Sequence, residues 1–124
     1  MSEITSSGGG VAIANTLVWV SVPGNVVALA KTKGYILDNN NLTTATLPAQ
    51  MPSGHIIRIV GNGTGKFLIA QNAGQSIKLG NVSSTGGVMG SLASTLQYDA
   101  VELLCTTTNS VFVVIDSVGN FIIS

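Results

Sequence analysis

The chain has 124 residues, which fits a single domain with one hydrophobic core. Only 8% of its residues are charged and 45% are hydrophobic, so it has fewer charges than the surface of an ordinary soluble monomer carries. The five basic and five acidic side chains form no cluster, which argues against binding to nucleic acid or to an anionic membrane. We therefore expect Ser, Thr, Asn, Gln and Gly to cover part of the surface and other copies of the chain to cover the rest.

The start of the chain and its single cysteine set further bounds. The opening SEITSSGGG is small, polar and glycine-rich, so residues 1–10 are predicted to form a leader or linker ahead of one domain at 11–124. No apolar run reaches the ~20 residues that cross a bilayer, and the start lacks the regions of a secretory signal, so membrane insertion is not expected. Cys105 has no partner for an internal disulfide and is predicted to be a buried thiol.

Short β-type runs separated by turn residues follow one another along the chain. No stretch has a helical period, and turn sequences such as Pro-Gly-Asn and Pro-Ser-Gly lie between the runs. This rhythm predicts an all-β protein, a jelly-roll-like β-sandwich, whose last run is a C-terminal strand packed into a sheet. The runs occupy residues 11–22, 25–31, 33–37, 42–47, 55–60, 66–71, 75–79, 100–105, 110–116 and 120–124.

The run GNGTGK raises the question of a phosphate-binding loop. Such a loop needs Gly, four residues, Gly, Lys and then Ser or Thr ahead of a helix. Here Val60 stands at the first glycine position, and Phe67 follows Lys66 without a hydroxyl group. We therefore predict a β-hairpin that joins the runs at 55–60 and 66–71, with the glycines supplying positive φ angles.

Residues 80–97, GNVSSTGGVMGSLASTLQ, interrupt the rhythm with a long glycine- and serine-rich stretch. Loops of this length inside a compact domain are usually functional or disordered. Four apolar residues are predicted to anchor this loop onto the sandwich or onto a neighbouring subunit: Val88, Met89, Leu92 and Leu96.

The titratable residues form no recognisable catalytic motif. Asp38 and Asp99 lie beside turns, where a carboxylate usually accepts hydrogen bonds from backbone amides. His55, the only histidine, enters a predicted strand and is expected to be partly exposed there. Three copies of it around a threefold axis are a chemical alternative that would bind a metal. The sequence otherwise predicts no catalytic residue, no metal and no cofactor.

Three aromatic residues have rings that could stack on the apolar face of a sugar: Trp19, Tyr35 and Tyr98. Trp19 stands in the apolar run LVWVSV, which fits a core position better than a binding platform. Tyr98 follows the long glycine-rich stretch and is the better binding candidate.

Several phrases resemble the C-terminal domains of bacteriophage tail fibres and similar tips on bacterial fibre-like adhesins. They are LVWVSV, GYILDNNNLTTATLPAQMPSGHIIRIVGNGTGKFLIAQNAGQSIKLGN, TGGVMGSLASTLQYDAVELLC and the terminal VGNFIIS. The resemblance covers most of the chain beyond residues 1–10. It implies a homotrimer at the far end of a virion tail fibre or other extracellular fibre, which contacts a cell surface without catalysis. The family often has an acidic residue where His55 stands, so the resemblance assigns His55 no role.

Three functional hypotheses follow. The first is a non-enzymatic fibre tip that recognises a host or prey cell-surface receptor, either a glycan or a protein. The second is a purely structural trimerisation or decoration domain. The third is a polysaccharide depolymerase, which needs two carboxylates within about 10 Å of each other in a cleft. For the first hypothesis, the candidate receptor-binding residues are Asn62, Thr64, Ser84, Thr85 and Tyr98.

Overall fold

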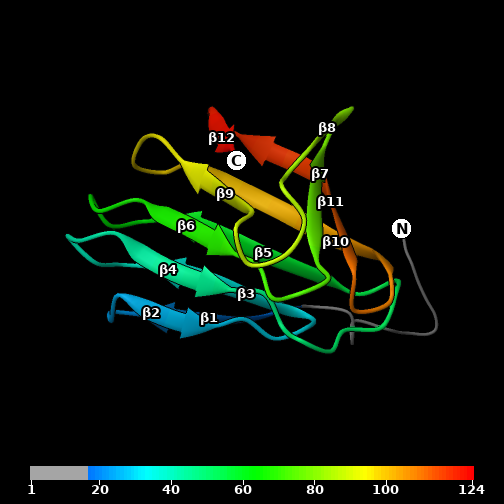
Figure 1. Ribbon diagram of the computed structural model, residues 1–124. Coiled ribbons are helices and arrows are strands. Elements are labelled where there is room, and N and C mark those ends of the chain that lie inside the picture. The colour runs from blue at the N-terminus through cyan, green and yellow to red at the C-terminus, as the bar shows by residue number, and fades with distance from the viewer. Residues whose placement is uncertain (1–16) are drawn as a thin grey trace, which may run out of the picture.

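The computed structural model describes residues 17–124, which form two β-sheets and no helix (Figure 1). The seven-stranded sheet has the order β1-β3-β5-β10-β11-β7-β8, and the five-stranded sheet has the order β12-β9-β6-β4-β2. The all-β prediction is confirmed, and the two sheets agree with a β-sandwich. The predicted leader at residues 1–10 lies outside the described residues. The strands are β1 Val18–Val22, β2 Val26–Ala28, β3 Lys33–Leu37, β4 Thr43–Thr46, β5 Ile56–Gly61, β6 Phe67–Ala70, β7 Ser76–Leu79, β8 Val82–Ser83, β9 Ser91–Ser94, β10 Ala100–Thr107, β11 Val111–Val118 and β12 Phe121–Ile123.

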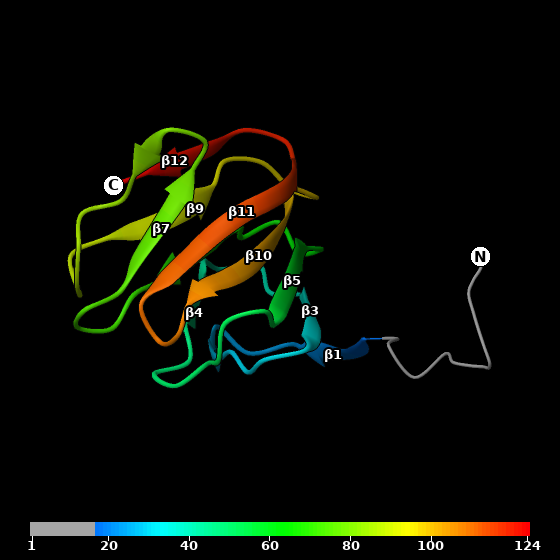
Figure 2. The same ribbon diagram turned by 90° about the vertical axis from the view of Figure 1, so that its right-hand side faces the viewer.

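The first six strands alternate between the two sheets. β1, β3 and β5 pair in parallel in one sheet, and β2, β4 and β6 pair in parallel in the other. The chain therefore winds through three coils, each made of one odd-numbered strand, a crossing loop and one even-numbered strand. After the coils, β10 pairs antiparallel with β5, and β11 returns beside β10 as a hairpin (Figure 2).

The coiled arrangement changes two expectations about topology. Five of the ten strand pairs are parallel, whereas a jelly roll consists of antiparallel strands, so the jelly-roll part of the prediction is not confirmed. The predicted hairpin between 55–60 and 66–71 is wrong. β5 and β6 lie in different sheets, and the glycine-rich loop between them crosses from one sheet to the other.

Close stacking of loops explains the alternate glycines of GNGTG. A Cβ atom on Gly63 would overlap the backbone of Asn39, and one on Gly65 would overlap the backbone of Asn41. The amides of Gly63 and Gly65 donate hydrogen bonds to the carbonyl oxygens of Leu37 and Asn39, at 2.9 and 3.0 Å. The third coil therefore lies directly on the second at this point, and any side chain would separate them.

Alternate residues along the strands point into a core between the two sheets. In β5, Ile57 and Ile59 are buried, while Arg58 between them points outward. Phe67 and Phe112 are the largest of the fully buried side chains and come from opposite sheets. Cys105 is also fully buried as a free thiol, which confirms that prediction.

The stretch at 80–97 contains two strands that the sequence did not predict, β8 and β9. Leu92 lies on the inner face of β9 and is fully buried, as expected of an anchor. The other three predicted anchors, Val88, Met89 and Leu96, are exposed, so they do not fix this stretch onto the sandwich of their own chain. Their contact with a neighbouring subunit stays a prediction.

The outer faces of the two sheets differ in charge. Within residues 17–124, strands of the seven-stranded sheet carry four charged residues in outward-facing rows, Arg58, Lys78, Glu102 and Asp116, whereas no strand of the five-stranded sheet carries a charged residue. The outer face of the five-stranded sheet, called the uncharged face below, presents side chains that are neighbours from strand to strand. They form one row of Val26, Thr44, Leu68, Ala93 and Ile122 and a second row of Ala28, Thr46, Ala70 and Ser91.

Candidate functional site

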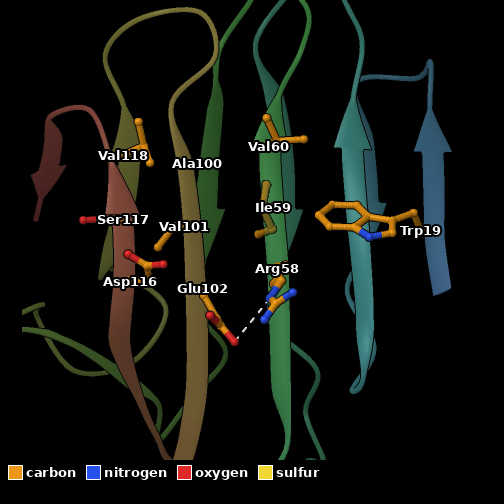
Figure 3. A pocket seen from close by; sticks show the side chains of 10 residues that line it. All are labelled: Trp19, Arg58, Ile59, Val60, Ala100, Val101, Glu102, Asp116, Ser117 and Val118. Carbon is orange, nitrogen blue, oxygen red and sulfur yellow. Dashed lines mark ion pairs between the residues drawn. The ribbon is translucent and has the colours of Figure 1, made fainter. Parts of the chain in front are cut away.

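A groove of about 330 Å³ lies on the outer face of the seven-stranded sheet (Figure 3). The pairing register places five residues from successive strands in one row across this face: Trp19, Gly34, Arg58, Glu102 and Asp116. Residues paired across neighbouring strands share an orientation, so this row faces outward together. Trp19 and Asp116 are four strand spacings apart, about 19 Å at the usual separation.

Trp19 lies flat on the sheet over Gly34. A Cβ atom on Gly34 would be 2.5, 2.6 and 2.8 Å from Cε3, Cδ2 and Cε2 of the indole. Because a Cβ stands nearly perpendicular to the sheet, these similar distances place the ring plane roughly parallel to it. One ring face covers Gly34, the other points outward, and Trp19 is 47% exposed. The prediction of a core position for Trp19 is therefore wrong, since the ring lies on the outside of the sheet.

Arg58 and Glu102 form an ion pair in the middle of the row. They face each other across β5 and β10, and Arg58 Nε lies 3.3 Å from Glu102 Oε2. Their side chains are 46% and 16% exposed. Because Arg58 is nearly half exposed, the pair is expected to stabilise the fold by only about 1 kcal/mol or less.

A β-bulge places Asp116 in the groove. Leu103 pairs with Val114 and Glu102 pairs with Asp116, which leaves Ile115 as an extra residue on β11. In a regular strand without the bulge, simple alternation from the inward-facing Phe112 would point residue 116 into the core. The bulge therefore turns an exposed carboxylate toward Glu102 on the outer face (Figure 3).

A second, apolar row runs beside the first. Val60, Ala100 and Val118 are paired neighbours on β5, β10 and β11, and all three line the groove. The groove thus combines an aromatic ring, one guanidinium, two carboxylates and an aliphatic strip. This composition is typical of sites that fix a ligand by apolar contact and orient it with a few polar groups.

Three of the five sequence-predicted residues lie together at one end of the sandwich. Asn62 and Thr64 belong to the loop between β5 and β6, and Tyr98 precedes β10. The Tyr98 amide donates to the carbonyl oxygen of Gly61 at 2.7 Å, and Gln97 Nε2 donates to that of Asn62 at 2.9 Å. Tyr98 has a φ of 72° and is 62% exposed. A positive φ is rare for an aromatic residue. The backbone at Tyr98 is therefore held in an unfavourable conformation that leaves the ring exposed.

The other two predicted residues lie at the opposite end of β6. Ser84 is buried, and its hydroxyl donates to Gln71 Oε1 and accepts the amide of Ile77 at 2.8 Å. Ser84 is therefore a poor candidate for the receptor binding predicted from the sequence, because its hydroxyl is engaged inside the protein. Thr85 is exposed, and its backbone amide donates to the carbonyl oxygen of Ser124 at 3.0 Å.

Two other titratable residues, Asp99 and His55, make local contacts. Asp99 Oδ2 accepts hydrogen bonds from the amides of Thr95 and Leu96 at 2.9 and 3.0 Å, the capping role expected of it. His55 is half-buried just ahead of β5, with Nδ1 3.2 Å from Thr32 Oγ1. Within residues 17–124, no three His, Cys, Asp or Glu side chains gather closely enough to hold a metal ion. The same part of the chain contains no helix that is long and apolar enough to cross a membrane.

Two regions therefore offer chemistry for recognition: the groove beside Trp19 and the loop end around Tyr98. The sequence predicted the loop end around Tyr98 and did not predict the groove. Neither the protein-family models nor the curated proteins compared with this chain match it. The role of both regions is accordingly inferred from their own geometry.

Proposed function

We propose that this chain is a non-enzymatic recognition domain at the tip of a homotrimeric fibre, as in bacteriophage tail fibres, and that it binds a cell-surface glycan or protein. The observation that carries this proposal is the unequal distribution of charge over the two sheets. An uncharged and partly apolar sheet face favours burial against another copy of the chain. The opposite face and the loop end then remain open to a receptor.

The uncharged face suits contact between subunits. Its two rows consist of Ala, Ser, Thr, Val, Leu and Ile, whose short side chains allow a close approach between packed layers. Val26 and Ile122, at the two edges of the first row, are more than half exposed in the single chain. Burial of such positions in a trimer removes apolar surface from water, which supplies the driving force for assembly.

A depolymerase is the second candidate, because Glu102 and Asp116 face each other in the groove. Directly opposed residues have Cβ atoms about 5 Å apart, so their two carboxyl groups can reach the separation that two-carboxylate hydrolysis needs. A general acid, however, works best in an apolar enclosure that keeps its carboxyl protonated. Asp116 is exposed and Glu102 is ion-paired with Arg58, so the arrangement favours binding over hydrolysis.

The solution mass and the binding of the same sample test the proposal. We expect light scattering to give about three times the 12.6 kDa of one chain, unchanged on dilution. We expect the trimer to bind bacterial cells or a glycan array, with avidity raised by its three copies. A monomer at every concentration contradicts the fibre-tip proposal, and a stable trimer without any binding favours the purely structural hypothesis. Release of new reducing ends from a bound polysaccharide favours the depolymerase.

A further inference from the structure

We infer that the groove beside Trp19 binds an uncharged oligosaccharide, with Trp19 as the stacking platform and Arg58, Glu102 and Asp116 as its polar partners. This inference rests on the proposed recognition function and names its ligand class and its residues. The groove residues differ from the loop residues Asn62, Thr64 and Tyr98, so the two locations can be tested separately.

The orientation of Trp19 favours a sugar ring. The indole lies parallel to the sheet with one face on Gly34, so its other face forms a flat apolar surface beside the groove. Pyranose rings present C–H groups on one face, and such a face stacks on a flat aromatic surface while the hydroxyls remain at the ring edge. The ring can lie this close to the sheet because its paired residue, Gly34, has no side chain.

The polar residues match the hydroxyl groups of a saccharide. A hydroxyl both donates and accepts, whereas a guanidinium only donates and an ionised carboxylate only accepts. Arg58 and Glu102 together offer one group of each kind at a separation of 3.3 Å. Asp116 adds a second acceptor on the next strand, and within residues 17–124 it forms no ion pair that would occupy it.

Charge and length narrow the ligand class. One guanidinium and two carboxylates give the groove a net negative charge, which disfavours sialic acids, uronic acids and other anionic sugars. The row from Trp19 to Asp116 spans about 19 Å, longer than one sugar ring. The aliphatic strip of Val60, Ala100 and Val118 runs along it and offers apolar contact to further C–H faces. These features favour a ligand of several neutral sugar units in a row.

The single tryptophan makes the groove directly observable, because all indole fluorescence of the chain comes from Trp19. The whole chain is titrated with neutral oligosaccharides, namely glucans, mannans, galactans and N-acetylglucosamine oligomers. Oligogalacturonate and sialic acid oligomers serve as anionic controls. We expect at least one neutral series to shield Trp19 from acrylamide quenching and the anionic series to leave the quenching unchanged. Shielding by no neutral series, or by the anionic series alone, overturns the inference.

Substitutions then separate the groove from the loop end. Asp116→Asn removes one charged acceptor at an exposed position, and we expect about tenfold weaker binding without loss of folding. Trp19→Ala is expected to abolish binding on a glycan array. Val82→Ala removes an exposed side chain on β8, at the opposite edge of the same sheet, and is the matched control that should leave the affinity unchanged. Tyr98→Ala tests the loop end separately.

The outcomes distinguish failure of this inference from failure of the proposed function. Glycan binding that survives Trp19→Ala and Asp116→Asn but is lost in Tyr98→Ala shows that the groove inference is wrong and the recognition function stands. Cell binding without any saccharide binding likewise overturns the groove inference alone and points to a protein receptor. A monomer that binds neither cells nor saccharides contradicts both proposals.

Discussion

The side-chain amide of Gln71 donates a hydrogen bond to the carbonyl oxygen of Gln75, 2.8 Å away, where β6 ends. Both side chains are almost fully buried, at 4% and 1% exposure. The carbonyl oxygens of Thr85 and Gly87 also lie within 2.9 Å of Gln71 Nε2, and Gln75 Nε2 donates to Pro48 O at 2.8 Å. The sequence IAQNAGQ therefore contains two buried glutamines, Gln71 and Gln75, whose side chains hydrogen-bond loops distant in the sequence to the end of the sandwich.

Replacing Gln75 by Leu removes the hydrogen bonds of its side chain at nearly constant volume, whereas the bond from Gln71 to the Gln75 backbone carbonyl remains. The Pro48 carbonyl and the Asn72 amide, both bonded to the Gln75 side chain, lose their partner in a part-buried environment. We expect the free energy of unfolding to fall by about 2 to 4 kcal/mol, measured by urea denaturation. Gln50→Leu, at an exposed position, is the matched control and should change it by less than about 0.5 kcal/mol. Equal effects of the two substitutions would contradict the role given to Gln75.

Replacing Gly34 by Ala should lift the indole of Trp19 off the sheet. The added Cβ would lie 2.5 Å from Cε3 of the ring, closer than atoms in contact can approach, so the ring must move toward solvent. We expect the tryptophan emission to shift to longer wavelength and acrylamide quenching to increase. Gly86→Ala adds the same methyl group where nothing lies within 4 Å and should leave the spectrum unchanged. An unshifted Gly34→Ala spectrum would mean that the ring does not depend on this glycine.

A charge placed on the uncharged face should prevent trimer formation. Ala93 lies in that face between Leu68 and Ile122, its paired neighbours on the adjacent strands. Ala93→Asp would bury three carboxylates without partners in a trimer that uses this face, which costs several kcal/mol each. We expect light scattering to give the mass of one chain and circular dichroism to retain the β signal. Thr106→Asp, at an exposed position of β10, should remain trimeric.

Local pattern was enough to locate most strands but not to assign them to sheets. The ten predicted runs all contain strands, because alternation and turn residues act over a few neighbouring positions. The hairpin between β5 and β6 was mispredicted since a glycine-rich loop can reverse the chain within a sheet or cross between sheets. The choice depends on Gly63 lying against Asn39, a contact with an earlier coil that no short window reveals.

The groove was missed for the same reason. Trp19 stands in an apolar run and has the local pattern of a core residue, yet its position follows from the pairing of β1 with Gly34 on β3. Asp116 reaches the outer face only through the bulge at Ile115. Both facts are set by strand register, and register depends on the whole sheet. The loop residue Tyr98 could be proposed from sequence because its exposure is a property of its own turn.

Cys105 gives the fold a pH dependence at alkaline pH. Burial raises the pKa of its thiol above the ordinary 9.0, although backbone hydrogen bonds at Asn109 and Thr107 lower it in part. As the pH rises, the unfolded chain loses this proton first, so the stabilising contribution is present below pH 9 and is lost as the pH approaches the folded pKa. We expect urea midpoints to fall above pH 9 and native Cys105 to resist iodoacetamide until the chain unfolds. The urea midpoint of Cys105→Ala, compared with its own midpoint at pH 7, should fall less above pH 9 than the midpoint of the unchanged protein, because the thiol no longer contributes. An identical fall in both proteins would assign the alkaline pH dependence to other groups.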